Sequence, residues 1–186
     1  MKLRLTFASL AFSLLLGTVG VDAADSTGAP AVAKSAAPES FQIRNQKFGD
    51  LLRPEDANNA PGTRLVLYSA QPWKCVTWKF LPAGDTVFQL QNHFTGKTFA
   101  ADAKPGQVQP AVTQVVFAKE AGERPRWQFT KLSDGTYRIN DPQSGKALTA
   151  VKAEGSSTVT IAIEPWRDAG EQKWELLKTD PAKLTM

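Results

Sequence analysis

The chain has 186 residues, a formal net charge of +4, one Cys and one His. A single Cys excludes an internal disulfide, and one Cys with one His cannot supply the usual ligand set of a zinc site. The basic residues are scattered rather than gathered in runs, which does not favour nucleic-acid binding. No nucleotide fingerprint, phosphate-binding loop or nucleophile elbow is present, so we expect no cofactor, no metal and no enzymatic activity.

The first 23 residues have the layout of a secretory signal. Lys2 and Arg4 precede an apolar run over residues 5–21, and small residues stand at the two positions that a signal peptidase reads before a cut after Ala23. The alternative is a membrane anchor, but the strongly apolar part, residues 10–21, is shorter than the roughly 20 residues that a spanning helix needs. We therefore expect a secreted or periplasmic protein that is not inserted in a membrane after cleavage.

Residues 24–40 are rich in Ala, Pro and Ser and have no apolar face to bury. This composition predicts a flexible spacer. The globular domain is predicted over residues 41–178, and residues 179–186 are predicted to form a C-terminal tail.

The predicted domain contains the same phrase three times, in units of about 41–87, 88–136 and 137–178. The matching positions are the opening aromatic (Phe41, Phe88, Tyr137), a turn Gly (Gly49, Gly96, Gly145) and a closing Trp (Trp78, Trp127, Trp174). The opening phrase of each unit alternates apolar and polar residues, which is typical of a half-buried strand. The Gly supplies the positive φ of a tight hairpin turn. Each unit is therefore predicted to form four short strands.

Three four-stranded units predict an all-β fold of twelve strands arranged about a pseudo-threefold axis, which is a β-trefoil. The closing Trp of each unit is expected in the core, because it recurs at the same point of every unit. Cys75, next to apolar neighbours, is expected to be a buried apolar residue rather than a reactive or intermolecular thiol. His93 lies in a turn without a partner at a suggestive spacing, so we expect it at the surface.

These motifs resemble the ricin-B-type β-trefoil lectin family. The resemblance covers residues 41–178 and rests on the Gly-Lys-x-Leu phrase and on a degenerate Gln-x-Trp motif, whose Gln survives only at Gln172, before Trp174. In that family a sugar site combines an Asp after the second strand, an aromatic ring on the third strand and an Asn before the Trp. A carboxylate accepts hydrogen bonds from sugar hydroxyls, and a ring offers flat apolar area.

No unit of this chain keeps the complete set. The three site positions fall in the three units on Arg53, Ala100 and Thr149 for the Asp, on Tyr68, Phe117 and Glu164 for the ring, and on Cys75, Arg124 and Glu171 for the Asn. The resemblance therefore implies candidate ligand-binding residues rather than an intact site: Arg53, Tyr68 and Trp73 in unit one, Asp102, Phe117 and Arg124 in unit two, and Trp166 and Gln172 in unit three. Trp73 and Trp166 each follow a Pro on a predicted loop, where a Trp is either a lid over the core or an exposed stacking platform.

Two functions remain open at this point. The resemblance implies a secreted, non-enzymatic module that binds a glycan on aromatic residues. The absence of an acidic residue at all three Asp positions favours the alternative, a protein-binding trefoil such as a protease inhibitor or an accessory subunit of an exported toxin complex.

Overall fold

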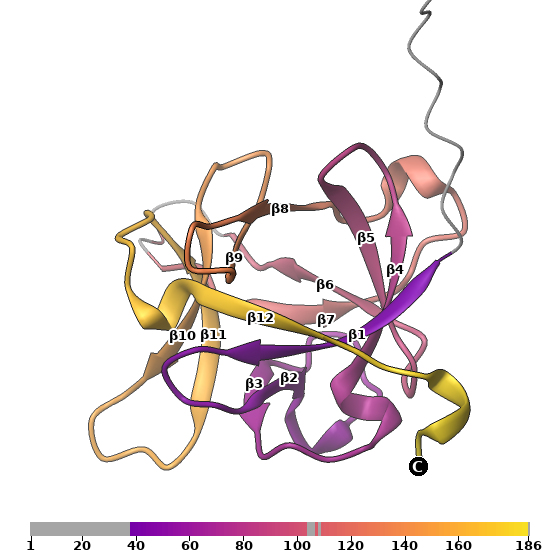
Figure 1. Ribbon diagram of the computed structural model, residues 1–186, viewed down its shortest axis with the longest axis horizontal. Coiled ribbons are helices and arrows are strands. Elements are labelled where there is room, and N and C mark those ends of the chain that lie inside the picture. Colours follow the sequence, from indigo (N-terminus) through magenta and orange to yellow (C-terminus); the bar gives the residue numbers. More distant parts are fainter. Residues whose placement is uncertain (1–37, 104–106, 108, 186) are drawn as a thin grey trace, which may run out of the picture. The chain divides into compact units, whose positions relative to one another are not determined.

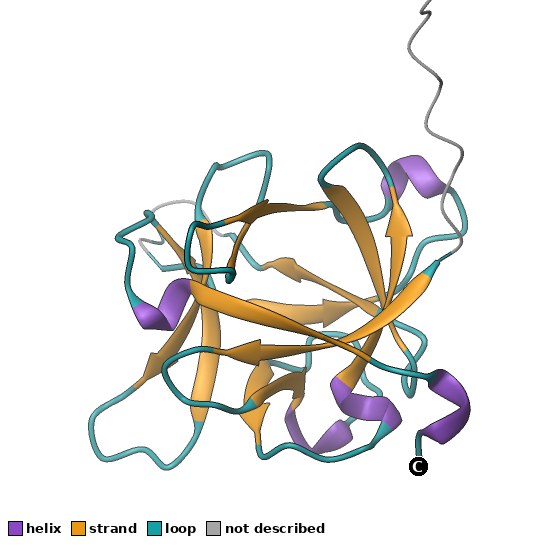
Figure 2. Cartoon of the chain, in the orientation of Figure 1, coloured by secondary structure: helices purple, strands orange, loops and turns teal. Residues whose placement is uncertain are grey.

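The computed structural model describes residues 38–103, 107 and 109–185, so the predicted signal and nearly all of the predicted spacer lie outside the described residues. These residues form twelve strands and five short 3-10 helices, with no α-helix among them (Figures 1 and 2). The strands are β1 (Glu39–Asn45), β2 (Leu51–Pro54), β3 (Leu65–Tyr68), β4 (Thr77–Pro82), β5 (Val87–Asn92), β6 (Thr98–Ala101), β7 (Val112–Val115), β8 (Trp127–Lys131), β9 (Tyr137–Asn140), β10 (Ala147–Lys152), β11 (Val159–Glu164) and β12 (Lys173–Lys178). The helices are η1 (Glu55–Ala57), η2 (Lys74–Val76), η3 (Ala121–Glu123), η4 (Gly170–Gln172) and η5 (Pro181–Lys183). None of the described helices is long and apolar enough to cross a membrane.

The first and fourth strands of each unit close into a six-stranded barrel. Antiparallel pairing runs from β1 to β4, β5, β8, β9 and β12 and returns to β1. The remaining strands form three hairpins, β2–β3, β6–β7 and β10–β11, and the hairpins also pair with one another at three isolated points. This closed arrangement leaves the barrel without free edges and confirms the predicted twelve-stranded β-trefoil.

The closing Trp of each unit joins the barrel to its own hairpin. The three indoles are at most 2% exposed and form the centre of the core. Each Nε1–H donates to a backbone carbonyl at the same place in the hairpin: Trp78 to Leu52 at 3.0 Å, Trp127 to Phe99 at 3.2 Å and Trp174 to Leu148 at 3.0 Å. A buried indole N–H needs such a partner, so the recurring Trp links barrel to hairpin, and its predicted place in the core is confirmed.

Two local expectations of the repeat are also met. The turn glycines Gly49, Gly96 and Gly145 have φ of 73°, 67° and 68°, the left-handed region that a side chain would strain. Cys75 is 3% exposed and packs with Leu51 and Val76, which confirms its prediction as a buried apolar residue.

The strand register differs from the sequence alignment of the units in one respect. Arg53 pairs with Val66, and Ala100 pairs with Thr113, so the residue that corresponds to Tyr68 in unit two is Val115. Phe117 lies two residues beyond that position, after the end of β7. The second unit therefore has two additional residues between β7 and the closing Trp. Aligning Phe117 with Tyr68 in the sequence hid this insertion.

The segment after β12 is part of the fold rather than a separate tail. Thr185 forms a parallel bridge with Trp73, donates its N–H to the Pro72 carbonyl at 2.8 Å and accepts from the Lys74 N–H at 3.0 Å. Figure 1 shows this C-terminal segment running beside η2 at the lower right of the view. The loop that carries Trp73 is thus held from both sides.

Candidate functional site

The pseudo-threefold axis relates three surface positions, each between the second strand of one unit and the first turn of the next. In unit two this position is a cavity of about 810 Å³, lined by Ala100, Arg126 and the turn over residues 141–146. In unit three it is a smaller cavity of about 210 Å³, lined by Thr149, Glu164 and the turn of unit one. The three positions have diverged, because the side chain on the second strand differs in each.

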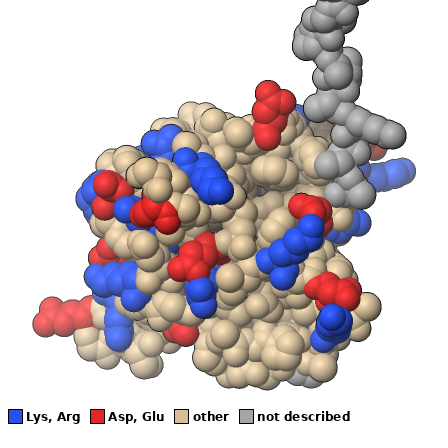
Figure 3. Space-filling model, in the orientation of Figure 1, with Lys and Arg blue, Asp and Glu red and all other residues tan. Residues whose placement is uncertain are grey.

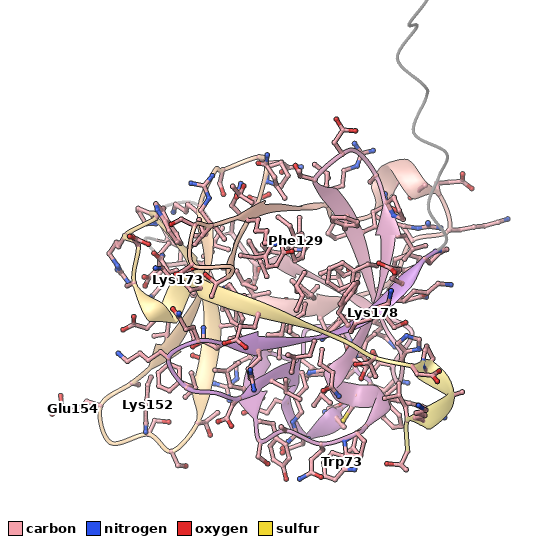
Figure 4. All side chains as sticks on the ribbon, in the orientation of Figure 1. Trp73, Phe129, Lys152, Glu154, Lys173 and Lys178 are labelled. Atoms are coloured by element: carbon pink, nitrogen blue, oxygen red, sulfur yellow. The ribbon has the colours of Figure 1, made fainter. Side chains whose placement is uncertain are left out.

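In unit one the second-strand residue at this position is a cation, Arg53. The guanidinium carbon of Arg53 lies 3.6 Å from the centroid of the Tyr68 ring, a close cation–π contact. The Trp73 ring is stacked on Tyr68, with the centroids 5.8 Å apart and the planes at 28°. Tyr68 is 36% exposed and Trp73 half-buried, and Figure 4 shows Trp73 at the lower edge of the molecule. The structure therefore brings together all three residues predicted for unit one.

Arg53 is one of two described arginines, with Arg138, whose buried Nε has no hydrogen-bond partner. Figure 3 shows Lys and Arg interspersed with Asp and Glu over one face, and many of them are paired, such as Lys47 with Glu171 at 2.5 Å and Arg64 with Glu55 at 2.8 Å. Arg53 is 9% exposed, and its buried Nε has no hydrogen-bond partner. Within the part of the chain that the structure describes, no carboxylate forms an ion pair with it.

Unit two holds its predicted residues differently. Arg124 also lies over a ring, 4.2 Å from the Phe117 centroid, but its Nε and Nη2 donate to the carbonyls of Ala118 and Lys119, both at 2.6 Å. These bonds hold Arg124 against its own loop, and its guanidinium lies over the Phe117 ring. Asp102 is exposed just beyond the end of β6 and does not line the unit-two cavity. The structure does not join these three residues in one cleft.

In unit three Gln172 is fully buried and its amide is in use. It donates to the Thr149 hydroxyl and the Pro165 carbonyl, both at 2.9 Å, and accepts from the Arg167 N–H at 2.7 Å. These bonds position the loop before the closing Trp, and they leave no polar atom of Gln172 facing a ligand. Trp166 is half-buried, 5.6 Å from the guanidinium of Arg138 rather than beside Gln172.

No protein-family model matches the sequence, and no curated protein matches it either. Solved structures do match. The designed threefold-symmetric protein ThreeFoil gives a TM-score of 0.65 at 22% identity, over 74% of this chain and 97% of that one. The Macrolepiota procera ricin B-like lectin, solved with lactose, gives 0.62 at 14% identity, over 78% of this chain and 99% of the lectin. A chain of the cytolethal distending toxin of Actinobacillus actinomycetemcomitans gives 0.61 at 15% identity, over 75% and 90%.

The fold is the β-trefoil of the ricin-B-type lectins. At these identities the likeness concerns the fold, and it confirms the resemblance that the repeated motifs indicated.

One exposed aromatic residue, Phe94, was not among the residues predicted for the site. Phe94 is 45% exposed, in the turn after β5. The residues at the same place in the other units, Lys47 and Gln143, line the cavities of units three and two. The pseudo-symmetry therefore sets Phe94 at the equivalent surface position of unit one, and the Lys97 ammonium of the same turn donates to the Asn59 side chain of unit one at 2.5 Å. Aligning the first turns of the three units could have identified Phe94 from the sequence.

The single His is half-buried rather than fully at the surface. Its Nε2 lies 2.8 Å from the Ser40 hydroxyl. Burial, reinforced by the positive charges of Lys79 and Lys74, lowers the pKa of His93 below its usual value. The described residues contain no group of three or more His, Cys, Asp and Glu side chains arranged to hold a metal ion.

Proposed function

We propose that this trefoil is an exported, non-enzymatic carbohydrate-binding module whose sugar site is the surface around Arg53, Tyr68 and Trp73 in unit one. The observation that carries the proposal is the Tyr68–Trp73 pair, two stacked rings at the surface with Arg53 against one of them. Sugars bind proteins by laying an apolar ring face on an aromatic side chain while polar groups engage the hydroxyls. Among the three surface positions, this is the one where a ring occupies the third-strand position.

The geometry also limits how a sugar can sit. Arg53 covers one face of Tyr68, so the apolar face of a sugar would lie on Trp73 and on the exposed part of Tyr68. The loop of Trp73 is fixed by Thr185 and by the Thr77 hydroxyl, which donates to the Trp73 carbonyl at 2.9 Å. Because its loop is already fixed, the Trp73 ring loses little conformational freedom when a ligand binds. This low entropic cost allows a ligand with a small contact area to bind.

The test is a glycan array with purified residues 24–186, compared with Trp73→Ala and with the matched variant Phe117→Ala. Specific binding that disappears in Trp73→Ala and persists in Phe117→Ala supports the proposal. Binding that survives Trp73→Ala moves the site to another unit. A folded protein that binds no glycan refutes the carbohydrate function.

A second candidate is a protein-binding trefoil. One observation favours it: a chain of the cytolethal distending toxin has the same fold over 90% of its length. An accessory role in an exported complex, or inhibition of a protease through the loops, would then replace sugar binding. Co-purification of a defined partner from the exported fraction, together with a silent glycan array, would support this candidate.

Export is itself part of the proposal. The supporting feature is the basic, apolar and small-residue order of residues 1–23. N-terminal sequencing of the protein recovered from the periplasm or medium should begin at Ala24. Recovery of the intact N-terminus in the membrane fraction would contradict cleavage and favour an anchor.

A further inference from the structure

Arg53 combines deep burial with the lack of an acidic partner. The residue is 9% exposed, and its Nε is sealed from solvent without a hydrogen bond. Its one described side-chain contact of polar character is the face of the Tyr68 ring. A buried charge normally has an oppositely charged partner, because removing an ion from water is costly.

The surroundings do not supply that partner. Glu55, two residues further along the chain, is engaged by Arg64, whose Nε and Nη2 reach both of its oxygens at 2.8–3.2 Å. Lys74, at the other side of Trp73, adds another positive charge to this part of the surface. No described carboxylate neutralises Arg53, so its charge is available to an acidic ligand.

The residues that correspond to Arg53 in the other two units carry no charge. Ala100 and Thr149 stand where Arg53 stands, and neither carries a charge. Arg124, the arginine that lies over a ring in unit two, has its donors taken by two backbone carbonyls. Arg53 alone of these residues combines a buried cation, an exposed ring and unoccupied donors.

We propose that the surface site of unit one selects an acidic glycan, a sugar that carries a carboxylate or a sulfate ester, with the anion held by the Nη groups of Arg53. This inference rests on the proposed carbohydrate function and names the ligand class of that same site. The sugar ring lies on Trp73, while the acidic group points toward the strand that carries Arg53.

The chemistry of arginine favours this ligand over a neutral sugar. A guanidinium presents a planar fork of donors that matches the two oxygens of a carboxylate or sulfate. The stacking on Tyr68 holds the fork in one orientation, so little side-chain freedom is lost on binding. A neutral hydroxyl would leave most of the charge of Arg53 uncompensated in a partly desolvated site.

The experiment measures binding of matched sugars by isothermal titration calorimetry to the purified exported protein. The probes are oligogalacturonate, galactose 6-sulfate and neutral galactose oligomers. We expect the acidic sugars to bind about tenfold more tightly, because a hydrogen bond to a charged group exceeds a neutral one by about 1.4 kcal/mol, which is a factor of ten in Kd. Arg53→Gln should remove the preference, and Arg53→Lys, which keeps the charge but not the fork, should retain part of it.

Arg44→Gln is the matched control, since it removes a cation of the same unit whose acidic partner, Glu175, lies on β12. It should leave the acidic preference unchanged. Equal binding of acidic and neutral sugars, or a preference that survives Arg53→Gln in a protein with a normal melting curve, would overturn the inference while leaving the carbohydrate function standing.

A second measurement separates failure of the inference from failure of the proposed function. Inorganic sulfate should raise the melting temperature of the wild type by more than that of Arg53→Gln, because its general stabilising effect acts on both proteins and specific binding on the wild type alone. If sulfate does so but no sugar of either kind binds, the glycan is refuted as the ligand. If sulfate stabilises the wild type no more than Arg53→Gln and acidic sugars bind no better than neutral ones, the anion site is refuted.

Discussion

Replacing Gln172 with Ala distinguishes a structural residue from a ligand contact. The change removes three hydrogen bonds, to Thr149, Pro165 and Arg167, from a fully buried side chain. At about 1 kcal/mol net for each bond, we expect a loss of about 3 kcal/mol in the free energy of unfolding. For a domain of this size that corresponds to a fall in melting temperature of about 6–12 °C.

The assay is urea denaturation followed by circular dichroism, with a glycan-binding measurement on the folded fraction. Gln172→Met keeps the volume of the side chain and should be nearly as destabilising, because the hydroxyl, carbonyl and N–H partners remain unsatisfied. Binding per folded molecule should not change in either variant. A loss of stability below about 0.5 kcal/mol, or a loss of binding without a loss of stability, would refute the structural role argued for Gln172.

Trp174→Phe should destabilise the domain by about 2–4 kcal/mol in the same assay, because the Leu148 carbonyl loses its buried donor and a small cavity remains; a loss under about 1 kcal/mol would contradict this role. The free energy of unfolding should be highest above the unfolded pKa of His93, about 6.5, and fall as the pH decreases through its lowered folded-state pKa. His93→Gln should flatten this part of the stability curve, and an unchanged curve would show that His93 does not cause it. Truncation after Thr179 should red-shift the fluorescence of Trp73 and lower stability by about 1–3 kcal/mol, since two backbone hydrogen bonds to its loop are lost; an unchanged spectrum would show that the C-terminal segment does not hold the loop.

The fold could be predicted from the sequence because its determinants are repeated and local. A turn that needs positive φ leaves a Gly, such as Gly96, at the same place in each unit. A buried indole that ties barrel to hairpin leaves a Trp, such as Trp127, at a fixed distance. Three copies in step specify a closed trefoil even though each copy alone is ambiguous.

The candidate site was less predictable, because its residues occur once. Tyr68 and Phe117 look equivalent when aromatics are aligned, and strand pairing shows that Val115 is the true counterpart of Tyr68. Trp73 was visible as a loop Trp, but its support by Thr185 joins segments 112 residues apart in the chain. A contact between such distant segments leaves no periodicity or spacing in the sequence from which it could be predicted.

The pattern of what is kept and what is lost bears on function. The Trp-to-carbonyl bond is present in all three units, so folding tolerates little change at that point. The second-strand position holds Arg, Ala and Thr in turn; Thr149 accepts a buried hydrogen bond from Gln172, whereas Ala100 has no polar side chain. A buried arginine at a position where Ala suffices contributes an uncompensated charge rather than stability. Arg53 is accordingly the residue on which the proposed acidic-glycan site depends, and the proposed binding experiments test that dependence.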